Sequence, residues 1–311
     1  MENKYVTFVL NNGQENLTEI TNEQFNNIKS AKENLVKMLY IEEKFNFIVE
    51  NFLDLEHDLL KVTLNKVYFQ SYTLDWSLSV SEIHLINRRL INLLTTTKLY
   101  LDQITHDINM ISHGIPEFTE QIKIKTNNQY DNVLGYRVME ALRNYVQHRG
   151  LPVHVLSYNS KSLDENQFLE EDIMETEHSI SPMIRLADLE KDGKFKKTIL
   201  NELKELGSKI NIKNYTREYI ESLFQIHKFL RDTLNVDVQK WETIINNAFS
   251  IHTHKYNDLK MIVIGEQLPT NGFITNRQYI TSDYIKRRKW LESKNSNLSN
   301  ITSKIITTDI N

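Results

Sequence analysis

The sequence predicts an all-α protein: a bundle of long antiparallel helices, with additional C-terminal helices and a minor β element. The 311 residues include only eight Gly and four Pro, far below the usual share of either residue. Apolar residues recur at helical steps over several long segments, whereas β-prone runs are few and short. With 40% hydrophobic residues, the chain can bury one large core or two smaller ones.

Composition also limits the classes of protein. The absence of cysteine excludes disulfides, thiolate metal sites and a cysteine nucleophile, and it fits a reducing compartment, so we expect a cytoplasmic protein. No apolar run approaches the length of a membrane span, and residues 1–13 lack a signal-peptide pattern, so no membrane partner is expected. The net charge of −4 argues against whole-molecule attraction to nucleic acid, although a local basic patch can still bind phosphate.

The first half of the chain predicts one strand and two long helices. Residues 4–10 are β-prone and end at an Asn-Asn-Gly turn signal. The apolar spacing predicts a helix from residue 21 to residue 60, and a second long helix that follows the capping box Ser79-x-x-Glu82. Helices of roughly 30 residues would be about 45 Å long, and each would cover the apolar stripe of the other in an antiparallel hairpin.

A third periodic segment, residues 130–146, leads into the motif described below and completes the predicted bundle. Residues 151–158 alternate weakly, which predicts a short strand that pairs with the N-terminal one. Residues 164–177 are rich in Asp and Glu, and we interpret them as a solvated loop rather than a docking surface.

Helical spacing resumes at Pro182 and continues through residues 199–206 and 219–249, and residues 260–265 predict a strand that joins the small sheet. From Ser293 onward, Ser, Asn, Thr and Lys dominate, which predicts a disordered tail. The expected organisation is a helical bundle with a short strand (1–150), a connecting strand and acidic loop (151–185), packed C-terminal helices (186–256), a short strand and basic segment (257–292) and the tail (293–311).

The segment that best suggests chemistry is Arg143-Asn144-x-x-x-His148, which is followed by the helix-stop residues Gly150 and Pro152. Side chains on the last turns of a helix can reach past its end, so the end of this helix is a plausible location for a binding or catalytic site. Asn144 and His148 share one face, but Arg143 lies about 140° around the helix from His148. One straight helix therefore cannot easily aim both Arg143 and His148 at one atom.

An Arg-Asn-x-x-x-His run that ends a helix within an all-α bundle resembles the Arg-x4–6-His signature of the HEPN superfamily, many of whose members are metal-independent ribonucleases. The likeness covers the motif and the general helical layout. It implies that Arg143, Asn144 and His148 are catalytic, that RNA is the substrate, that no cofactor is needed, and that two copies oppose their motifs in a homodimer. It also implies a toxin or defence effector, with a cognate antitoxin or regulatory protein as a further partner.

Cleavage of RNA without a metal needs a group that removes the 2′-hydroxyl proton and donors for the charge that grows on the phosphate. His148 suits the acid or base role, since imidazole titrates near neutral pH, and the forked guanidinium of Arg143 suits the phosphate. Asn144 would orient these groups, Tyr145 would stack on a base, and Arg149 would add positive potential. Some HEPN toxins carry a modified tyrosine two residues after the histidine, where this chain has glycine, so that regulation is not implied.

Two alternatives from other classes remain open, so the sequence leaves the question of enzyme activity open as well. Arg and His near a helix C-terminus also stabilise the helix dipole, which fits a non-catalytic helical dimerisation or sensor protein. An RNA-binding module without cleavage would use Arg149 together with the consecutive cations Lys286, Arg287, Arg288 and Lys289. The ordinary explanation of such a charge run is a solvated helix face.

No metal site or cofactor is expected. His252 and His254 suit a metal only if a third ligand comes from elsewhere. Asp102, His106 and Asp107 lie on the second predicted helix, where such pairs are typically surface contacts. The chain contains no P-loop, dinucleotide fingerprint, His-Glu-x-x-His or Gly-x-Ser-x-Gly motif.

Overall fold

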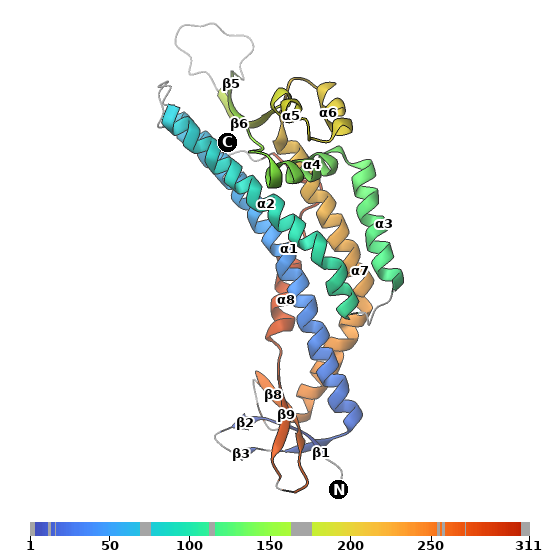
Figure 1. The fold of residues 1–311 in the computed structure, drawn as a ribbon. Helices are drawn as coiled ribbons and strands as arrows, with labels where there is room; N and C mark the ends of the chain where they lie inside the picture. The colour runs from blue at the N-terminus through green and yellow to red at the C-terminus, as the bar shows by residue number, and fades with distance from the viewer. Residues whose placement is uncertain are drawn as a thin grey trace. The chain divides into compact units, whose positions relative to one another are not determined.

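The computed structural model describes residues 4–11, 14–15, 17–68, 76–111, 116–162, 176–253, 256, 259–270 and 272–305 (Figure 1). This part of the chain is mostly helical, as the sequence predicts. Its helices are α1 (Asn22–Tyr68), α2 (Trp76–Ile111), α3 (Pro116–Asn132), α4 (Leu134–His148), α5 (Leu186–Asp192), α6 (Lys197–Lys204), α7 (Ile212–Thr253), α8 (Asp283–Lys294) and the 3₁₀ helix η1 (Ile301–Ser303). Among these residues, no helix combines the length and the apolar character needed to cross a membrane.

One of the two long N-terminal helices begins at a capping box, and the other does not. α1 begins after a capping box, in which the Gln24 backbone N–H donates to Thr21 Oγ1 (3.0 Å) and the Thr21 N–H donates to Gln24 Oε1 (2.8 Å). The capping box predicted at Ser79 does not start α2, which already begins at Trp76. A cap contributes only about 1 kcal/mol, so helix propagation can outweigh it.

The segment predicted as one helix over residues 130–146 is divided between α3 and α4. Val133 separates the two helices with extended backbone angles (φ −116°, ψ 113°). The Gly135 N–H donates to Glu218 Oε2 (2.8 Å), and a Cβ at position 135 would lie 2.5 Å from that same oxygen. Glycine therefore allows the start of α4 to approach α7 closely.

Four antiparallel strands form a sheet in the order β4-β1-β8-β9. They are β4 (Thr18–Ile20), β1 (Lys4–Phe8), β8 (Met261–Gln267) and β9 (Ile274–Thr281). Tyr5 pairs with Ile20 on one side of β1, and Thr7 pairs with Ile264 on the other. The prediction that residues 260–265 join the N-terminal strand is therefore confirmed. A two-stranded ladder joins β2 (Leu10–Asn11) to β3 (Gln14–Glu15).

A separate antiparallel sheet has the order β5-β6-β7, with β5 (Val155–Ser162), β6 (Thr176–Arg185) and β7 (Lys209–Asn211). The prediction that residues 151–158 pair with the N-terminal strand is wrong, because β5 pairs with β6. The prediction that helix resumes at Pro182 is also wrong, since burial alternates at Ile180, Pro182 and Ile184 as in a strand. Most of the predicted acidic loop, 164–177, lies outside the described residues, apart from the first two residues of β6.

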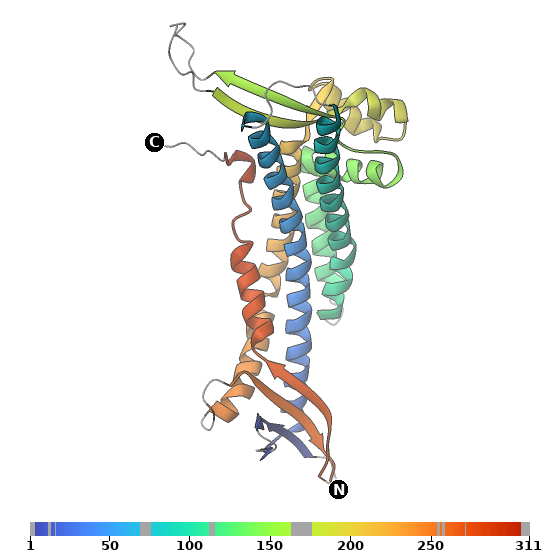
Figure 2. The same cartoon turned by 90° about the vertical axis from the view of Figure 1, so that its left-hand side faces the viewer.

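The chain divides into two compact units. The first comprises 1–46, 104–119 and 227–297, and the second comprises 47–103, 120–226 and 298–311. This division differs from the consecutive segments that the sequence suggests, because α1, α2, α3 and α7 each contribute residues to both units. Within the second unit, α4 lies beside α5 and α6, close to the β5–β6 hairpin (Figures 1 and 2).

The C-terminal segment is ordered over most of its length, which corrects the prediction of a disordered tail from residue 293. Ser293 and Lys294 end α8, and Leu298 and Ile301 are buried. Within the second unit, the Thr302 N–H donates to Glu221 Oε1 (3.0 Å). Two well-placed apolar residues and backbone hydrogen bonds are enough to fix a segment whose composition is polar. Residues 306–311 of the predicted tail lie outside the described residues.

Candidate functional site

The predicted end of the motif helix is confirmed, since α4 ends at His148. The Arg149 N–H donates to Tyr145 O (2.8 Å) and closes the last turn. The chain that follows is fixed to α2, because the Asn87 amide donates to Val153 O (2.9 Å) and accepts from the Val153 N–H (2.9 Å). Asn87 is buried, and its two hydrogen bonds hold the end of the motif in place. Sequence reasoning missed Asn87, because a single Asn within a helix gives no distinctive signal.

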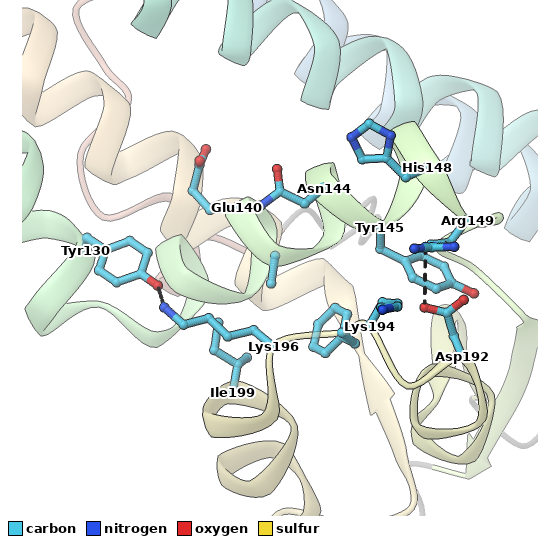
Figure 3. Close-up of a pocket in the computed structure, with 12 residues that line it drawn as sticks. Tyr130, Glu140, Asn144, Tyr145, His148, Arg149, Asp192, Lys194, Lys196 and Ile199 are labelled. Atoms are coloured by element: carbon cyan, nitrogen blue, oxygen red, sulfur yellow. Dashed lines mark hydrogen bonds and ion pairs between the residues drawn. The ribbon is translucent and has the colours of Figure 1, made fainter.

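A cavity of about 320 Å³ runs alongside α4 in the second unit (Figure 3). Its walls come from α3, α4, α5, α6 and the segment between α5 and α6. The lining residues are Tyr130, Glu140, Ala141, Asn144, Tyr145, His148, Arg149, Asp192, Lys194, Phe195, Lys196 and Ile199. The sequence had singled out four of these residues, all in or next to the motif. It had not indicated the opposite wall, which comes from residues far along the chain.

Arg143 does not line this cavity. Its side chain is 11% exposed, and its Nη2 lies 3.1 Å from Glu140 Oε2. Its Nε is buried without a hydrogen-bond partner. Glu140 Oε1 also accepts from the hydroxyl of Tyr219 (2.7 Å), whose pKa is raised by burial and by the charge of Glu140. The structure thus brings together Asn144 and His148 but turns Arg143 away from them, as the 140° separation predicts.

Two flanks of α4 contribute different chemistry to the cavity. Figure 3 shows Glu140, Asn144 and His148 along one flank, and Tyr145 and Arg149 on the flank that faces Lys194. Asn144 and His148 are exposed. Because Glu140, Asn144 and His148 are spaced at four-residue intervals, they form a row along the helix. A ligand in the cavity would contact a carboxylate, an amide and an imidazole in succession.

The opposite wall supplies cations. Lys194 and Lys196 are exposed, and the Lys196 ammonium donates to the Tyr130 hydroxyl while lying over its ring. Arg149 Nε lies 3.9 Å from Asp192 Oδ2, which is too far for a hydrogen bond, and this buried carboxylate oxygen has no hydrogen-bond partner. The cavity therefore offers several donors to an anion and one unsatisfied acceptor.

Tyr145 gives the cavity an aromatic surface. Its ring packs edge-on against Phe195, with centroids 6.3 Å apart and planes at 72°. Burial, followed by the charges of Asp192 and Asp188, raises the pKa of the Tyr145 hydroxyl. A Cβ at Gly150 would lie 3.0 Å from that hydroxyl oxygen, so a larger residue there would crowd the ring.

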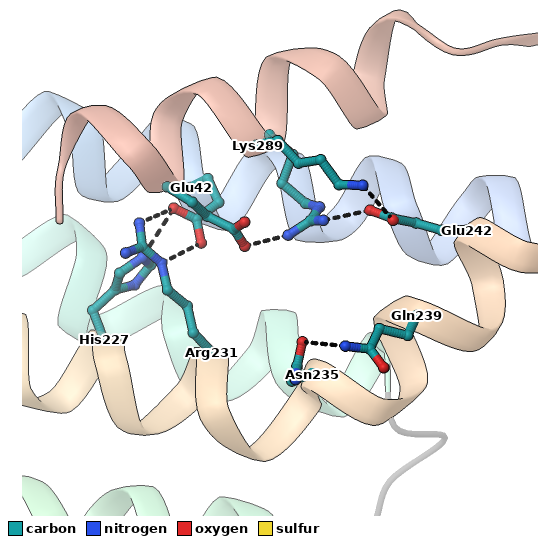
Figure 4. A network of polar contacts seen from close by, with 9 residues as sticks. Glu42, His227, Arg231, Asn235, Gln239, Glu242 and Lys289 are labelled. Atoms are coloured by element: carbon teal, nitrogen blue, oxygen red, sulfur yellow. Dashed lines mark hydrogen bonds and ion pairs between the residues drawn. The ribbon is translucent and has the colours of Figure 1, made fainter.

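Three of the four consecutive cations of α8, which the sequence suggests as a phosphate-binding strip, are paired with carboxylates. In the first unit, Arg287 pairs with Glu43 (2.7 Å), and Arg288 is buried against Glu242 (2.5 Å). Lys289 also pairs with Glu242 (2.7 Å) (Figure 4). Lys286 is exposed and has no ion pair within the described residues. Consecutive helical residues point 100° apart, so a run in sequence does not make a row in space.

The other predicted candidates have structural partners. His252 is buried, with Nε2 3.1 Å from Thr7 Oγ1, and its predicted companion His254 lies outside the described residues. Asp102 pairs with Lys98, Asp107 pairs with Lys44 (2.6 Å), and His106 is exposed. In the described part of the chain, no cluster of three or more His, Asp or Glu side chains could hold a metal ion.

The fold and the cavity define a mostly helical protein with a cationic, partly aromatic pocket at the end of a helix. Comparison of the chain with family models, with curated proteins and with solved structures gives no match. The functional argument therefore depends on the geometry of the pocket itself.

Proposed function

We propose that the pocket beside α4 binds RNA and that the chain is a metal-independent endoribonuclease of the HEPN type. One observation carries the proposal: the motif residues Asn144 and His148 line the same cavity as Arg149, Lys194 and Lys196. Phosphodiester cleavage without a metal uses an imidazole that transfers protons, cations that bind the phosphate and a ring on which a base can stack, and the cavity lining contains each of these groups.

In the proposed reaction, a base takes the proton of a ribose 2′-hydroxyl, and that oxygen attacks the adjacent phosphorus. The bond from phosphorus to the 5′ oxygen breaks, the leaving oxygen takes up a proton, and a 2′,3′-cyclic phosphate remains. His148 performs one of these two proton transfers, and Asn144 orients the ribose or the phosphate. A second copy with its motif opposed, as the resemblance implies, would supply the second imidazole.

The phosphate ligands of this proposal differ from those implied by the motif alone. Arg143 is paired with Glu140 and does not itself line the cavity, so we assign the charge that grows on the phosphate to Lys194 and Arg149 instead. The Asp192 carboxylate and Tyr145 both line the cavity; the carboxylate suits the amino group of a base, and the ring suits its face. The role as a toxin or defence effector, and an antitoxin or regulatory partner, stay part of the same proposal.

The antiparallel helical bundle is also part of the proposal. In the second unit, residues later in α1 contact residues earlier in α2. Asn51 bonds Thr96 (3.2 Å), whereas Asp54 and Asp58 bond Arg89 (2.7 and 2.6 Å). Because the residue number in α2 falls as the number in α1 rises, these contacts support an antiparallel pair of the kind that HEPN proteins contain.

A non-catalytic scaffold is the second candidate. The observation that favours it is the ion pair between Arg143 and Glu140, because a structural role for the motif arginine is what a scaffold requires. An RNA-binding module without cleavage uses the same pocket and differs only in its independence of His148.

The test expresses the wild type, His148→Ala, Lys194→Ala and Arg143→Ala at matched levels in a bacterial host and follows growth and RNA integrity. The matched control is His106→Ala, which removes an exposed imidazole outside the pocket. We expect growth arrest and RNA fragments with 2′,3′-cyclic ends from the wild type, from the control and from Arg143→Ala, whose side chain does not line the cavity, and from neither His148→Ala nor Lys194→Ala. Arrest that survives His148→Ala would favour binding without cleavage, and purified protein without affinity for single-stranded RNA would favour the scaffold.

A further inference from the structure

One face of α1 in the second unit carries an exposed apolar stripe. Leu53, Leu60, Leu64 and Val67 are 47%, 43%, 46% and 39% exposed, and the His57 side chain lies between Leu53 and Leu60. A different stripe of the same helix segment, Phe52, Leu55, Leu59 and Val62, is buried in the core. The core-facing and exposed stripes are separate, so the exposed leucines are not the edge of the core.

The exposed residues follow the spacing of a coiled coil. The steps from Leu53 to His57, Leu60, Leu64 and Val67 are four, three, four and three residues, which is the a/d pattern of the heptad repeat. An a/d stripe is the narrow seam of a two-helix contact, whereas a core-facing stripe is wider. We propose that this seam packs against the same seam of a second copy of the chain, with the two α1 helices antiparallel.

Charges beside the seam favour the second copy and the antiparallel direction. Asp54 and Lys61 both occupy e positions, and e positions face each other across an antiparallel pair. A two-fold axis near residue 58 places Asp54 of each copy against Lys61 of the other, so one charge pair forms twice. A parallel pair would instead need Glu56 as the partner of Lys61. Arg217 holds both oxygens of Glu56 (2.7 and 2.9 Å), whose side chain is 15% exposed, whereas Arg89 donates to one oxygen of Asp54 (2.7 Å), whose side chain is 51% exposed.

The layers of the seam agree with this direction. The two-fold axis that sets Asp54 against Lys61 also places Leu53 opposite Leu64 and His57 opposite Leu60, so each of these layers contains at least one leucine. A parallel pair would place His57 against His57. The seam is short, but α1 is a helix of 47 residues that is formed in advance, so association does not have to fix the backbone.

Because the chain has no cysteine, two cysteines can be introduced without competing thiols. Their positions can be chosen so that a disulfide forms between copies only if the two α1 helices are antiparallel. Under mild oxidation, the variant that combines Leu53→Cys with Leu64→Cys should form a disulfide-linked dimer, and Leu53→Cys alone should not. In an antiparallel pair, the two copies of position 53 are about 16 Å apart along the helices at 1.5 Å per residue, beyond the reach of a disulfide.

Light scattering after gel filtration supplies the second readout, on the full chain without oxidant. The wild-type assembly should have twice the mass of Leu60→Asp at micromolar concentration, whether or not opposed motifs add a further contact, and Lys61→Glu should weaken the association at least tenfold. Far-ultraviolet circular dichroism would confirm that Leu60→Asp still folds. The matched control is Leu206→Asp, which alters an exposed leucine elsewhere in the second unit.

A monomeric wild type, or a dimer that is unaffected by Leu60→Asp, would overturn the proposal. Crosslinking of Leu53→Cys alone would overturn the antiparallel direction and show a parallel pair. The seam contains no residue of the pocket, so its test and the ribonuclease test can fail independently.

Discussion

The guanidinium of Arg143 lies 3.1 Å from the carboxylate of Glu140, one turn earlier in α4. Both side chains are largely shielded from solvent, and Glu140 also holds the Tyr219 hydroxyl. This ion pair separates the two charged residues of the motif, because it uses Arg143 in the structure of α4 and leaves His148 exposed in the cavity.

Arg143→Ala should therefore reduce stability. Removing the guanidinium leaves a shielded carboxylate without its cation, which should cost about 1–3 kcal/mol. Urea unfolding measures this loss against Gln147→Ala, an exposed residue of the same helix, which should change stability little. A variant with unchanged stability that lacks RNA cleavage would instead assign Arg143 to catalysis.

Lys194→Ala should weaken RNA binding through loss of one phosphate contact. Each such contact adds about 0.7 to the slope of log affinity against log salt for single strands, so the slope should fall by about that amount. Binding to a fluorescent oligonucleotide across a salt series measures it. Lys191→Ala, an exposed cation of α5 outside the cavity, is the control. Equal salt slopes for both variants would place the RNA elsewhere.

Gly135→Ala should destabilise the protein, although the same change usually stabilises a helix by about 1 kcal/mol. The added Cβ would lie 2.5 Å from Glu218 Oε2 and 2.8 Å from Tyr215 O, and such overpacking typically costs about 1–3 kcal/mol. Thermal unfolding shows whether the substitution lowers or raises the stability of the protein. A raised melting temperature would show that α4 does not approach α7 this closely.

The sequence predicted the helical class, the end of α4 and the pairing of β8 with β1, because apolar spacing and helix-stop residues are local signals. The sequence did not predict the contacts between residues that lie far apart in the chain. The identity of Asn87 does not show that it holds Val153, and the charges of residues 286–289 do not show that carboxylates from α1 and α7 pair with them.

The same limit applies to the pocket. Asn144 and His148 were predicted from one helix, whereas Lys194 and Lys196 reach the cavity only because α5 and α6 pack beside α4. The position of Arg143 away from His148 follows from helical geometry, but its ion pair with Glu140 was not predicted. The side of the helix on which each motif residue lies could be predicted from the sequence, but the residue that each side chain contacts could not.

A buried polar cluster in the first unit predicts sensitivity to acid (Figure 4). Arg231 donates to both oxygens of Glu42 (2.8 and 2.5 Å), and His227 Nε2 lies 3.1 Å from Glu42 Oε2. Burial alone would raise the pKa of Glu42, but the charges and hydrogen bonds of His227 and Arg231 lower it to about 2. Burial lowers the pKa of His227, so Arg231 supplies the positive charge at neutral pH.

Both shifts should destabilise the protein as the pH falls. Glu42 has a lowered pKa, so its contribution is complete above pH 4.5 and is lost towards pH 2, with a total of about 3 kcal/mol. His227 must become charged on unfolding below its ordinary pKa, so stability begins to fall below about pH 6.5. Unfolding free energies measured in urea from pH 7 to pH 3 should decline.

Glu42→Gln provides the check on this account. It removes the titrating carboxyl, so its stability should be lower than that of the wild type at pH 7 and should fall less between pH 4.5 and pH 3. An equally steep decline in the variant would assign the acid sensitivity to other carboxylates.

Both compact units are assembled from separated stretches of chain, and this fixes the order in which they can form during synthesis. β1 lies near the start of the chain, yet its partner β8 leaves the ribosome more than 250 residues later. The first unit therefore cannot complete its sheet until β9, which ends at Thr281, has been made. Any cut after a residue from 47 to 296 would divide both units, so their roles are better separated by point substitutions than by fragments.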